Sequence, residues 1–159
     1  MNTLIEELNA MSLPEIWRYF GTLKPPEPGS LAGYYRGIFV GSAGLRALWG
    51  PLLRLTGLGG WWGKKFDTSG NAVNLTIKRG RGEPRFPMFV VTHRSYLDRQ
   101  PGLAMRYKPG NPLPWPYILD ELRRIDDRAL LGMTLVDVRP FRRLAFPFIL
   151  EKRETYDGL

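Results

Sequence analysis

The sequence predicts a mainly β protein, a single antiparallel β-barrel of the calycin or lipocalin type, with N-terminal helices and a helical insertion after the first strand. Three observations predict this fold. Short segments rich in aromatic and β-branched residues recur along the chain, separated by turns rich in Gly, Pro and Asp. Helical periodicity is confined to the part before residue 58. The chain has 159 residues, 43% of them hydrophobic, which suits one sizeable core rather than two domains.

We expect three parts along the chain. Residues 1–29 form a helical prelude, in which Ser12 and Glu15 have the spacing of a capping box and start a helix with one apolar side. Residues 30–154 form the barrel, which includes a helical insertion at 42–58. Residues 155–159 are expected to fray at the C-terminus.

The barrel is expected to begin with a strand at residues 31–40, centred on Gly33–Gly37. The insertion that follows has apolar residues at helical spacing, and Pro51 is expected to kink or divide it. Gly and Pro at 79–84 predict an exposed turn. The remaining strands are expected at 60–67, 72–78, 86–97, 103–108, 117–126, 129–138 and 145–153.

The stretch Gly60–Asp67 contains two adjacent tryptophans between glycines. In a strand, neighbouring side chains point to opposite faces, so we expect Trp61 with Lys65 on one face and Trp62 with Phe66 on the other. Glycines beside the tryptophans indicate that a large group approaches this backbone closely. The stretch therefore predicts the wall of a barrel that holds a small apolar molecule, with ordinary core packing of both tryptophans as the alternative.

Two groups of motifs resemble a known pair of domains. Gly33-Tyr34-Tyr35-Arg36-Gly37 and Gly60-Trp61-Trp62-Gly63-Lys64-Lys65-Phe66 resemble the GXWXG domain, although Tyr35 stands where that family has tryptophan and a long insertion separates the two motifs. Residues 116–127, continued by 131–133 and 147–151, resemble the domain of unknown function 4334 that usually follows it. Together the motifs cover most of residues 15–153. The resemblance implies a relationship but no established activity.

The order of elements is also that of intracellular fatty-acid-binding proteins, in which helices cover the mouth of the barrel. By this fold-level analogy, Leu45, Trp49, Leu52 and Leu53 would form the underside of a lid. Arg46 and Arg54 would then face an anionic membrane during a transient contact. The alternative is a helix that plugs the core and carries two surface arginines.

Composition excludes several classes of function. The chain has no cysteine and one histidine, His93, so it offers no disulfide, no thiolate chemistry and no multi-histidine metal site. We expect no cofactor, because no nucleotide, phosphate or metal motif is present. The net charge is +8, but the basic residues are scattered and match no nucleic-acid-binding pattern, so we expect no nucleic acid partner. The acidic N-terminus and the absence of a long apolar run predict a cytoplasmic protein.

Candidate ligand contacts are polar side chains on apolar faces and aromatic side chains on the expected walls. An arginine inside a wall needs an anion, which a ligand carboxylate or, for Arg124, the nearby Asp120 would supply. For His93 a hydrogen-bonded structural role is favoured over catalysis or haem ligation. The candidate site residues are Trp61, Trp62, Lys64, His93, Tyr96, Arg106, Tyr107, Asp120 and Arg124, with Trp115 as a further aromatic wall.

Three functional hypotheses remain open. The first, and our expectation, is a carrier or sensor that binds a small hydrophobic or amphipathic ligand, with a carboxylate as one option for its polar end. The second is a cofactor-free enzyme, such as an isomerase, cyclase or hydrolase, with His93, Tyr96 or Asp120 as acid or base. The third is a structural or partner-binding domain whose barrel is filled by its own side chains.

Overall fold

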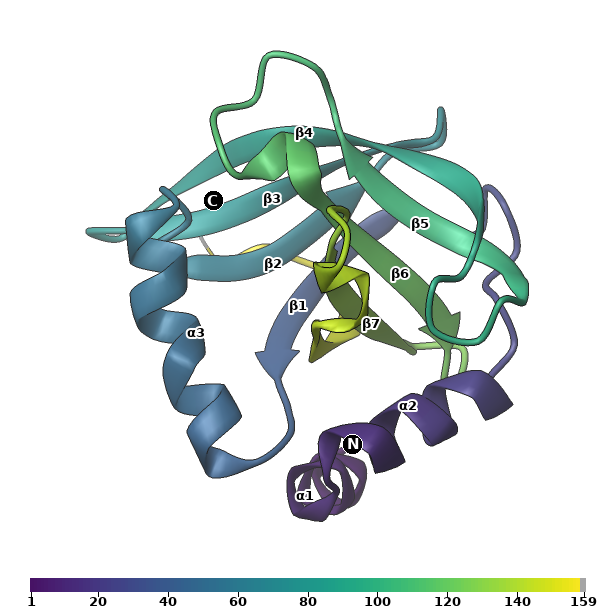
Figure 1. The fold of residues 1–159 in the computed structure, drawn as a ribbon. Coiled ribbons are helices and arrows are strands. Elements are labelled where there is room, and N and C mark those ends of the chain that lie inside the picture. Colours follow the sequence, from purple (N-terminus) through teal and green to yellow (C-terminus); the bar gives the residue numbers. More distant parts are fainter. Residues whose placement is uncertain (158–159) are drawn as a thin grey trace.

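The computed structural model describes residues 1–157 and shows a closed, eight-stranded antiparallel barrel with three α-helices (Figure 1), which confirms the predicted fold class. The strand order around the barrel follows the chain, and β8 pairs with β1. The helices are α1 (Asn2–Ala10), α2 (Leu13–Thr22) and α3 (Ala43–Leu55). The strands are β1 (Gly33–Phe39), β2 (Trp61–Phe66), β3 (Asn71–Lys78), β4 (Arg81–Arg94), β5 (Pro101–Tyr107), β6 (Ile118–Arg124), β7 (Ala129–Val136) and β8 (Ala145–Arg153).

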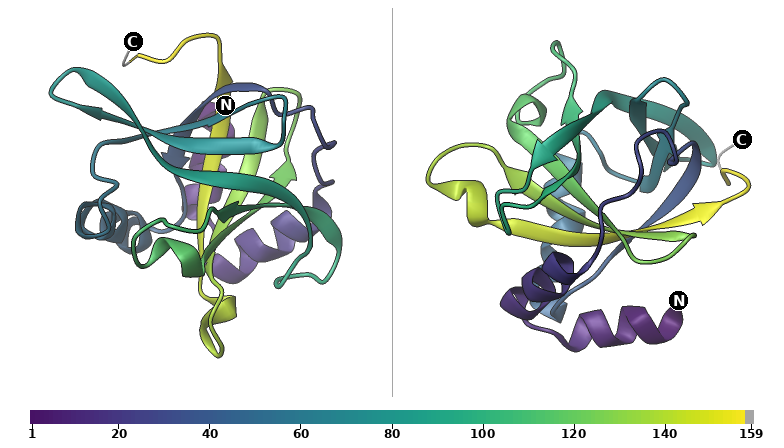
Figure 2. Two further views of the ribbon diagram at one scale, coloured as in Figure 1. Left: turned by 90° about the horizontal axis from the view of Figure 1, so that it is seen from above. Right: turned by 90° about the vertical axis from the view of Figure 1, so that its right-hand side faces the viewer.

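Every strand pairs with its neighbours in the chain, and the ring closes where Tyr34 of β1 lies opposite Arg153 of β8. Because consecutive strands run antiparallel, the β1–β2, β5–β6 and β7–β8 connections lie at the same end of the barrel. The first of these contains α3, and the other two contain the 3₁₀ turns η1 (Trp115–Tyr117) and η2 (Phe141–Arg143). Figure 2 shows these three connections on one side of the molecule.

Helices α1 and α2 pack against the outside of the barrel wall rather than over an end. The predicted capping box is present: the Glu15 carboxylate accepts hydrogen bonds from the Ser12 backbone N–H (2.7 Å) and hydroxyl (2.6 Å). Leu8, Ile16 and Phe20 are fully buried in one cluster with Leu119 and Ile149, which point outward from β6 and β8. No helix within residues 1–157 is both long and apolar enough to cross a bilayer.

Helix α3 lies across one end of the barrel, within the predicted insertion 42–58. Ser42 is its N-cap and accepts a hydrogen bond from the Leu45 backbone N–H, and Pro51 lies inside the helix without dividing it. Trp49 and Leu53 are buried toward the interior. Leu52, expected on the same underside, is exposed instead, because it lies one position away from the buried row.

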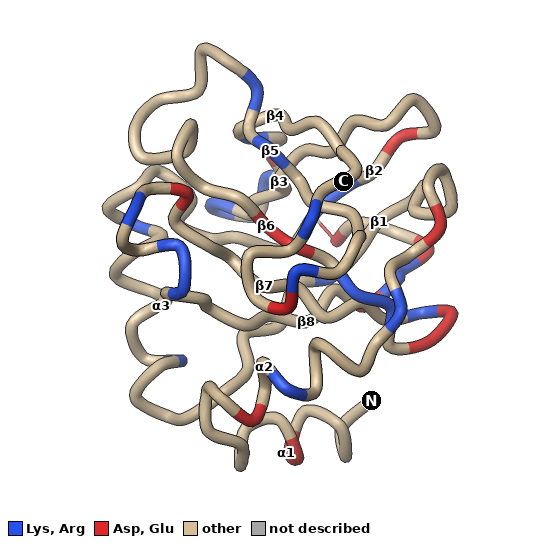
Figure 3. The backbone as a smooth tube through the Cα atoms, turned by 45° about the vertical axis from the view of Figure 1, so that its right-hand side comes forward, with Lys and Arg blue, Asp and Glu red and all other residues tan. Residues whose placement is uncertain are grey.

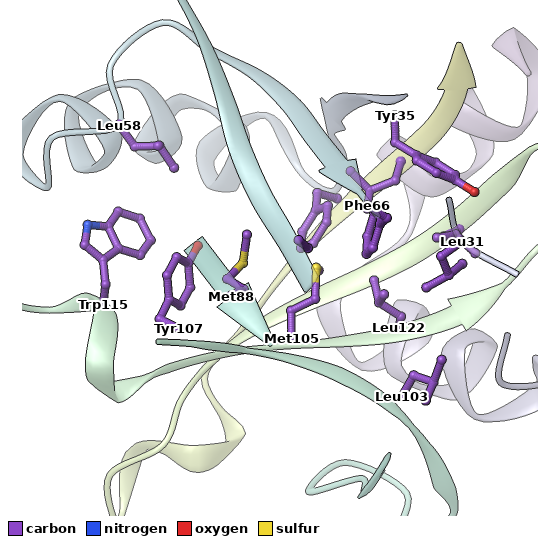
Figure 4. Packing of buried hydrophobic residues seen from close by; sticks show 14 of the residues in the cluster. Leu31, Tyr35, Leu58, Phe66, Met88, Leu103, Met105, Tyr107, Trp115 and Leu122 are labelled. Carbon is purple, nitrogen blue, oxygen red and sulfur yellow. The ribbon is translucent and has the colours of Figure 1, made fainter. Parts of the chain in front are cut away.

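The interior is filled mainly by apolar and aromatic side chains. In Figure 4, Tyr107, Trp115 and Leu58 lie at one end of this core, and Tyr35, Phe66 and Leu31 lie at the other. The register of β2 against β3 shifts between Trp61 and Gly63, which marks a β-bulge. Because the bulge adds one residue to β2, the prediction that Trp62 and Phe66 share a face is wrong. Trp61, Lys64 and Phe66 are inside the barrel, and Trp62 is outside.

The C-terminal segment is held against the barrel as far as residue 157, so the expected fraying at 155–157 is wrong. Tyr156 is buried between Trp62 and Tyr34, and its hydroxyl donates a hydrogen bond to the Thr76 carbonyl oxygen (2.5 Å). The Asp157 carboxylate accepts hydrogen bonds from Trp62 Nε1 (2.9 Å) and Arg36 (3.1 Å). Residues 158–159 of that prediction lie outside the described residues.

Candidate functional site

A buried polar cluster lies inside the otherwise apolar barrel. The Lys64 ammonium is 2.9 Å from Asp120 Oδ2 and donates a hydrogen bond to Asn74 Oδ1 at 2.8 Å. Asn74 Nδ2 donates to the Tyr107 hydroxyl (3.0 Å), and the Thr134 hydroxyl donates to Asp120 Oδ1 (2.7 Å). Both side chains of the ion pair are 3% exposed, so water contributes little to their solvation.

Strand pairing explains how the cluster is assembled. Lys64 on β2 lies directly opposite Asn74 on β3, and Asp120 on β6 lies directly opposite Thr134 on β7. Side chains of directly opposite residues point to the same face, so each hydrogen-bonded pair points inward together. The Lys64–Asp120 contact then joins the two pairs across the barrel interior.

The environment of the ammonium group is aromatic as well as acidic. Lys64 Nζ lies 5.8 Å from the centres of the Trp61 and Tyr107 rings and 5.9 Å from that of Phe148. Burial lowers the pKa of the Lys64 amine, and the charge and hydrogen bond of Asp120 oppose that effect. Burial also raises the pKa of Tyr107 well above 10.0, with the Asp120 charge adding to the rise.

A small cavity of about 30 Å³ lies between the polar cluster and α3. Its polar side consists of Lys64, Asn74, Asp120 and Thr134, and the rest is apolar or aromatic. Trp49 of α3 lines the cavity, and its indole Nε1 is buried without a hydrogen-bond partner. The apolar and aromatic lining consists of Phe39, Trp49, Leu53, Leu58, Trp61, Tyr107, Trp115 and Phe148.

Four of the nine candidate residues meet at this cavity: Trp61, Lys64, Tyr107 and Asp120. Trp61 Nε1 donates a hydrogen bond to Asn74 Oδ1 (3.1 Å), which connects the aromatic wall to the cluster. Two members of the cluster, Asn74 and Thr134, were missed by the sequence analysis. The signal for Asn74 was present, because it is a polar residue between Val73 and Leu75 in an apolar strand.

The other five candidates do not line the interior, which corrects the expectation that they face a cavity. Trp62 is on the outer face with Tyr156 because of the bulge in β2. Arg106 is also outside and pairs with Asp137 at 3.0 Å. Arg124 lies at the end of β6, where it is exposed and pairs with Asp127, so Asp120 is paired with Lys64 rather than with Arg124.

His93 and Tyr96 lie on the outside of β4 and the loop after it, next to the buried carboxylate of Glu121. This carboxylate accepts hydrogen bonds from the Ser95 hydroxyl (2.5 Å) and the Tyr96 backbone N–H (2.7 Å), and His93 Nε2 lies 3.1 Å from it. The serine is bonded to the glutamate and not to the histidine, so the group lacks the order of a nucleophilic triad. It ties the β4–β5 loop to β6.

The chain is therefore a closed eight-stranded antiparallel barrel with a helix over one end and an ion pair inside. Among residues 1–157 there is no group of three His, Cys, Asp or Glu side chains that could hold a metal ion. A crystallised protein from Thermomonospora curvata has a similar fold, with a TM-score of 0.59 and 19% sequence identity over 96% of this chain and 95% of that one. No family model matches the chain, and no curated protein matches it.

Proposed function

We propose that the barrel binds a small molecule with an apolar body and a polar end, as a carrier or sensor. The polar end would contact the Lys64–Asp120 cluster, and the body would lie among the aromatic side chains beneath α3. The observation that carries the proposal is the ion pair itself, held beside a cavity in an apolar interior.

A buried ion pair is a poor device for stability alone. Removing two charges from water costs several kcal/mol for each ion, about as much as their attraction returns, and apolar residues of similar volume often replace such a pair without loss. An interior designed only to pack would be apolar. The cluster therefore supports a role in recognition or chemistry, as perturbed ionisable groups in a cavity commonly do.

The charge of the cluster indicates what the polar end of the ligand would be. Lys64 and Asp120 already neutralise each other, so an anionic carboxylate would bring an unbalanced charge into the interior. A neutral group that accepts hydrogen bonds fits the cluster better than an anion. The Trp49 Nε1–H has no partner, and the Tyr107 O–H is available to an acceptor. A hydroxyl, carbonyl, amide or un-ionised carboxyl group fits these conditions.

The size of the cavity requires a movement of α3. A volume of about 30 Å³ has room for about two water molecules, whereas pockets for small molecules usually span several hundred Å³. Trp49 and Leu53 are the α3 side chains that occupy the space above the cluster. Gly41 before the helix and Gly57 after it both have positive φ angles, +107° and +83°, and are suitable hinge positions.

A second candidate is a cofactor-free enzyme, and one observation favours it. Lys64 is an amine whose pKa is lowered by burial, and it lies in hydrogen-bonding distance of Asp120 at the edge of a cavity. In this version Lys64, Asp120 and Tyr107 are the acid and base groups. His93 and Tyr96 are on the other side of the wall and have no part in it. The third hypothesis, a filled barrel, is favoured by the small cavity volume.

Native mass spectrometry of the freshly purified protein tests the proposal. We expect the wild-type protein to retain a small molecule that is released on denaturation. The Lys64→Met/Asp120→Leu double variant, in which apolar side chains replace the ion pair, should not retain it. Turnover of the recovered molecule by the wild-type protein would identify an enzyme instead. If no molecule is retained, and a library of amphipathic compounds leaves the tryptophan fluorescence and the thermal stability unchanged, the barrel is a filled structural domain.

We also propose a distant family relationship and a cytoplasmic location for this protein. The motifs around Gly33–Gly37, Gly60–Phe66 and residues 116–127 support distant kinship with the GXWXG and 4334 domains. The absence of cysteine supports a reducing, cytoplasmic setting. Recovery of a common ligand from a member of that family and from this protein would test the kinship, and localisation of a tagged chain would test the setting.

A further inference from the structure

Two loops that are distant in the sequence face each other on the outside of the barrel. The loop between β4 and β5 carries Tyr96, and the loop between β7 and β8 carries Arg142. The Arg142 guanidinium lies over the Tyr96 ring, 4.6 Å from the ring centre. Asp137 accepts hydrogen bonds from Arg142 (2.8 Å) and from Arg106 (3.0 Å), which fixes the second loop against β5. A hollow of about 490 Å³ lies between the two loops.

This hollow, which we call the arginine groove, is strongly basic. Five arginines line it, and within residues 1–157 only Arg142 has a carboxylate within ion-pair distance, that of Asp137. The other four arginines therefore line one hollow without a protein carboxylate to balance them, an arrangement that suits phosphate groups. The groove is lined by Arg94, Ser95, Tyr96, Arg99, Arg139, Pro140, Arg142 and Arg143.

The same loop exposes apolar side chains between its arginines. Phe141 is 50% exposed and Leu144 is 51% exposed. Apart from Met1 and Phe89, all large hydrophobic side chains exposed within residues 1–157 lie on three connections at the α3 end of the barrel. They are Leu48, Leu52 and Leu55 of α3, Leu113 and Tyr117 of the β5–β6 connection, and Val138, Phe141 and Leu144 of the β7–β8 loop.

Helix α3 contributes basic groups to the end of the barrel that carries the β7–β8 loop. It carries Arg46 and Arg54 and no acidic residue, so every charge on the helix that exposes these leucines is positive. In Figure 3, α1 carries acidic residues and no basic one. The combination of exposed aliphatic side chains with unpaired arginines is the pattern of a protein surface that binds anionic lipid.

We propose that the face of the barrel formed by α3, the β7–β8 loop and the arginine groove docks on an anionic phospholipid surface, with lipid phosphates in the groove and with Phe141 and Leu144 in the boundary between head groups and acyl chains. A soluble phosphate compound would use the arginines but leave the apolar side chains in water. A nucleic acid would also leave the leucines unused, because aliphatic side chains do not stack on bases. The inference goes beyond the proposed function and does not depend on what the cavity holds.

Vesicle co-sedimentation tests the inference with the full chain. We expect the protein to sediment with vesicles of phosphatidylcholine containing about 30 mol% phosphatidylglycerol at about 0.15 M salt, and not with pure phosphatidylcholine vesicles. Arg139→Gln/Arg143→Gln should weaken the binding about 30-fold, since each arginine near such a surface contributes about a factor of five. Phe141→Ser/Leu144→Ser should weaken it by about tenfold or more while leaving the charge unchanged.

The matched control is Arg18→Gln/Arg128→Gln, which removes the same charge from α2 and from the β6–β7 turn, two segments that neither line the arginine groove nor expose a large hydrophobic side chain. It should bind vesicles within about twofold of the wild type. Equal loss of binding in the control and in the groove variant would overturn the inference, as would sedimentation that ignores lipid charge. Tighter binding of soluble glycerol phosphate or of an oligonucleotide than of vesicles would also overturn it.

Discussion

The indole ring of Trp61 lies directly against Gly37. A methyl group added at Gly37 would come within 2.2 Å of the Trp61 ring, so β1 and β2 can approach in this way only if that position has no side chain. The ring itself has little freedom to move. It stacks on Phe39 with centroids 5.0 Å apart, meets the edge of Phe148 at 5.9 Å, and donates a hydrogen bond to Asn74.

Gly37→Ala is therefore expected to destabilise the protein. The added methyl group overpacks a fixed aromatic cluster, which typically lowers the free energy of unfolding by about 1–3 kcal/mol. Urea denaturation followed by tryptophan fluorescence measures the change. The control is Gly44→Ala in the first turn of α3, where a methyl group would meet no atom within 4 Å and alanine should not lower the stability. Equal stability of the two variants would show that Trp61 can move aside.

Removing one member of the interior ion pair should lower the free energy of unfolding more than replacing both members by apolar residues. Lys64→Met leaves the Asp120 carboxylate buried without its cation, which should lower the free energy of unfolding by about 3–5 kcal/mol. In the Lys64→Met/Asp120→Leu variant no charge is stranded, so most of that loss should be recovered. A double-mutant cycle from chemical denaturation gives the coupling energy. Additive effects of the two substitutions would mean that the charges do not depend on each other.

Alkaline pH should reveal the burial of Tyr107. Below pH 10.0 its hydroxyl is protonated in both the folded and the unfolded chain, so its contribution does not change with pH. Above pH 10.0 the unfolded tyrosine ionises while the native one, whose pKa is raised, keeps its proton, and stability falls as the pH rises. The wild type should therefore lose about 1.4 kcal/mol per pH unit relative to Tyr107→Phe. A difference that stays constant from pH 9 to 11 would contradict a buried hydroxyl.

Tyr156 should contribute to stability although it lies near the end of the chain. Tyr156→Phe removes the hydrogen bond to the Thr76 carbonyl oxygen and should lower the free energy of unfolding by about 1 kcal/mol. Tyr156→Ala also removes the ring packed on Trp62 and should lower it by about 3 kcal/mol. Thermal denaturation ranks the three proteins. If all three unfold at the same temperature, the segment is not held in solution.

Much of the fold could be predicted from the sequence because strand length, turn composition and alternation act locally. The last strand was predicted at its observed limits, 145–153. The errors occur where local signals mislead. Gly82 and Pro84 indicate a turn, yet both belong to β4, because Arg79 and Gly80 alone form the hairpin turn with φ angles of +52° and +74°.

The candidate site was only partly predictable, for two physical reasons. The bulge in β2 adds one residue and reverses the phase of the alternation, so Trp62 could not be assigned to a face from its neighbours. Arg106 and His93 were on apolar faces, as expected, but those faces form the outer wall, which is apolar because other elements cover it. Alternation identifies two faces of a strand and does not say which one is inside.

The pairing of β1 with β8 also has a consequence for how the molecule forms. Partners in this ladder, such as Gly37 and Leu150, come from opposite ends of the barrel sequence, so the ring stays open until the last strand has been synthesised. Contacts between such distant segments are slow to form, because a long loop must close before they contribute any stability. We expect a nascent chain that lacks β8 to expose the inner face of β1, and chaperone binding should end when that strand leaves the ribosome.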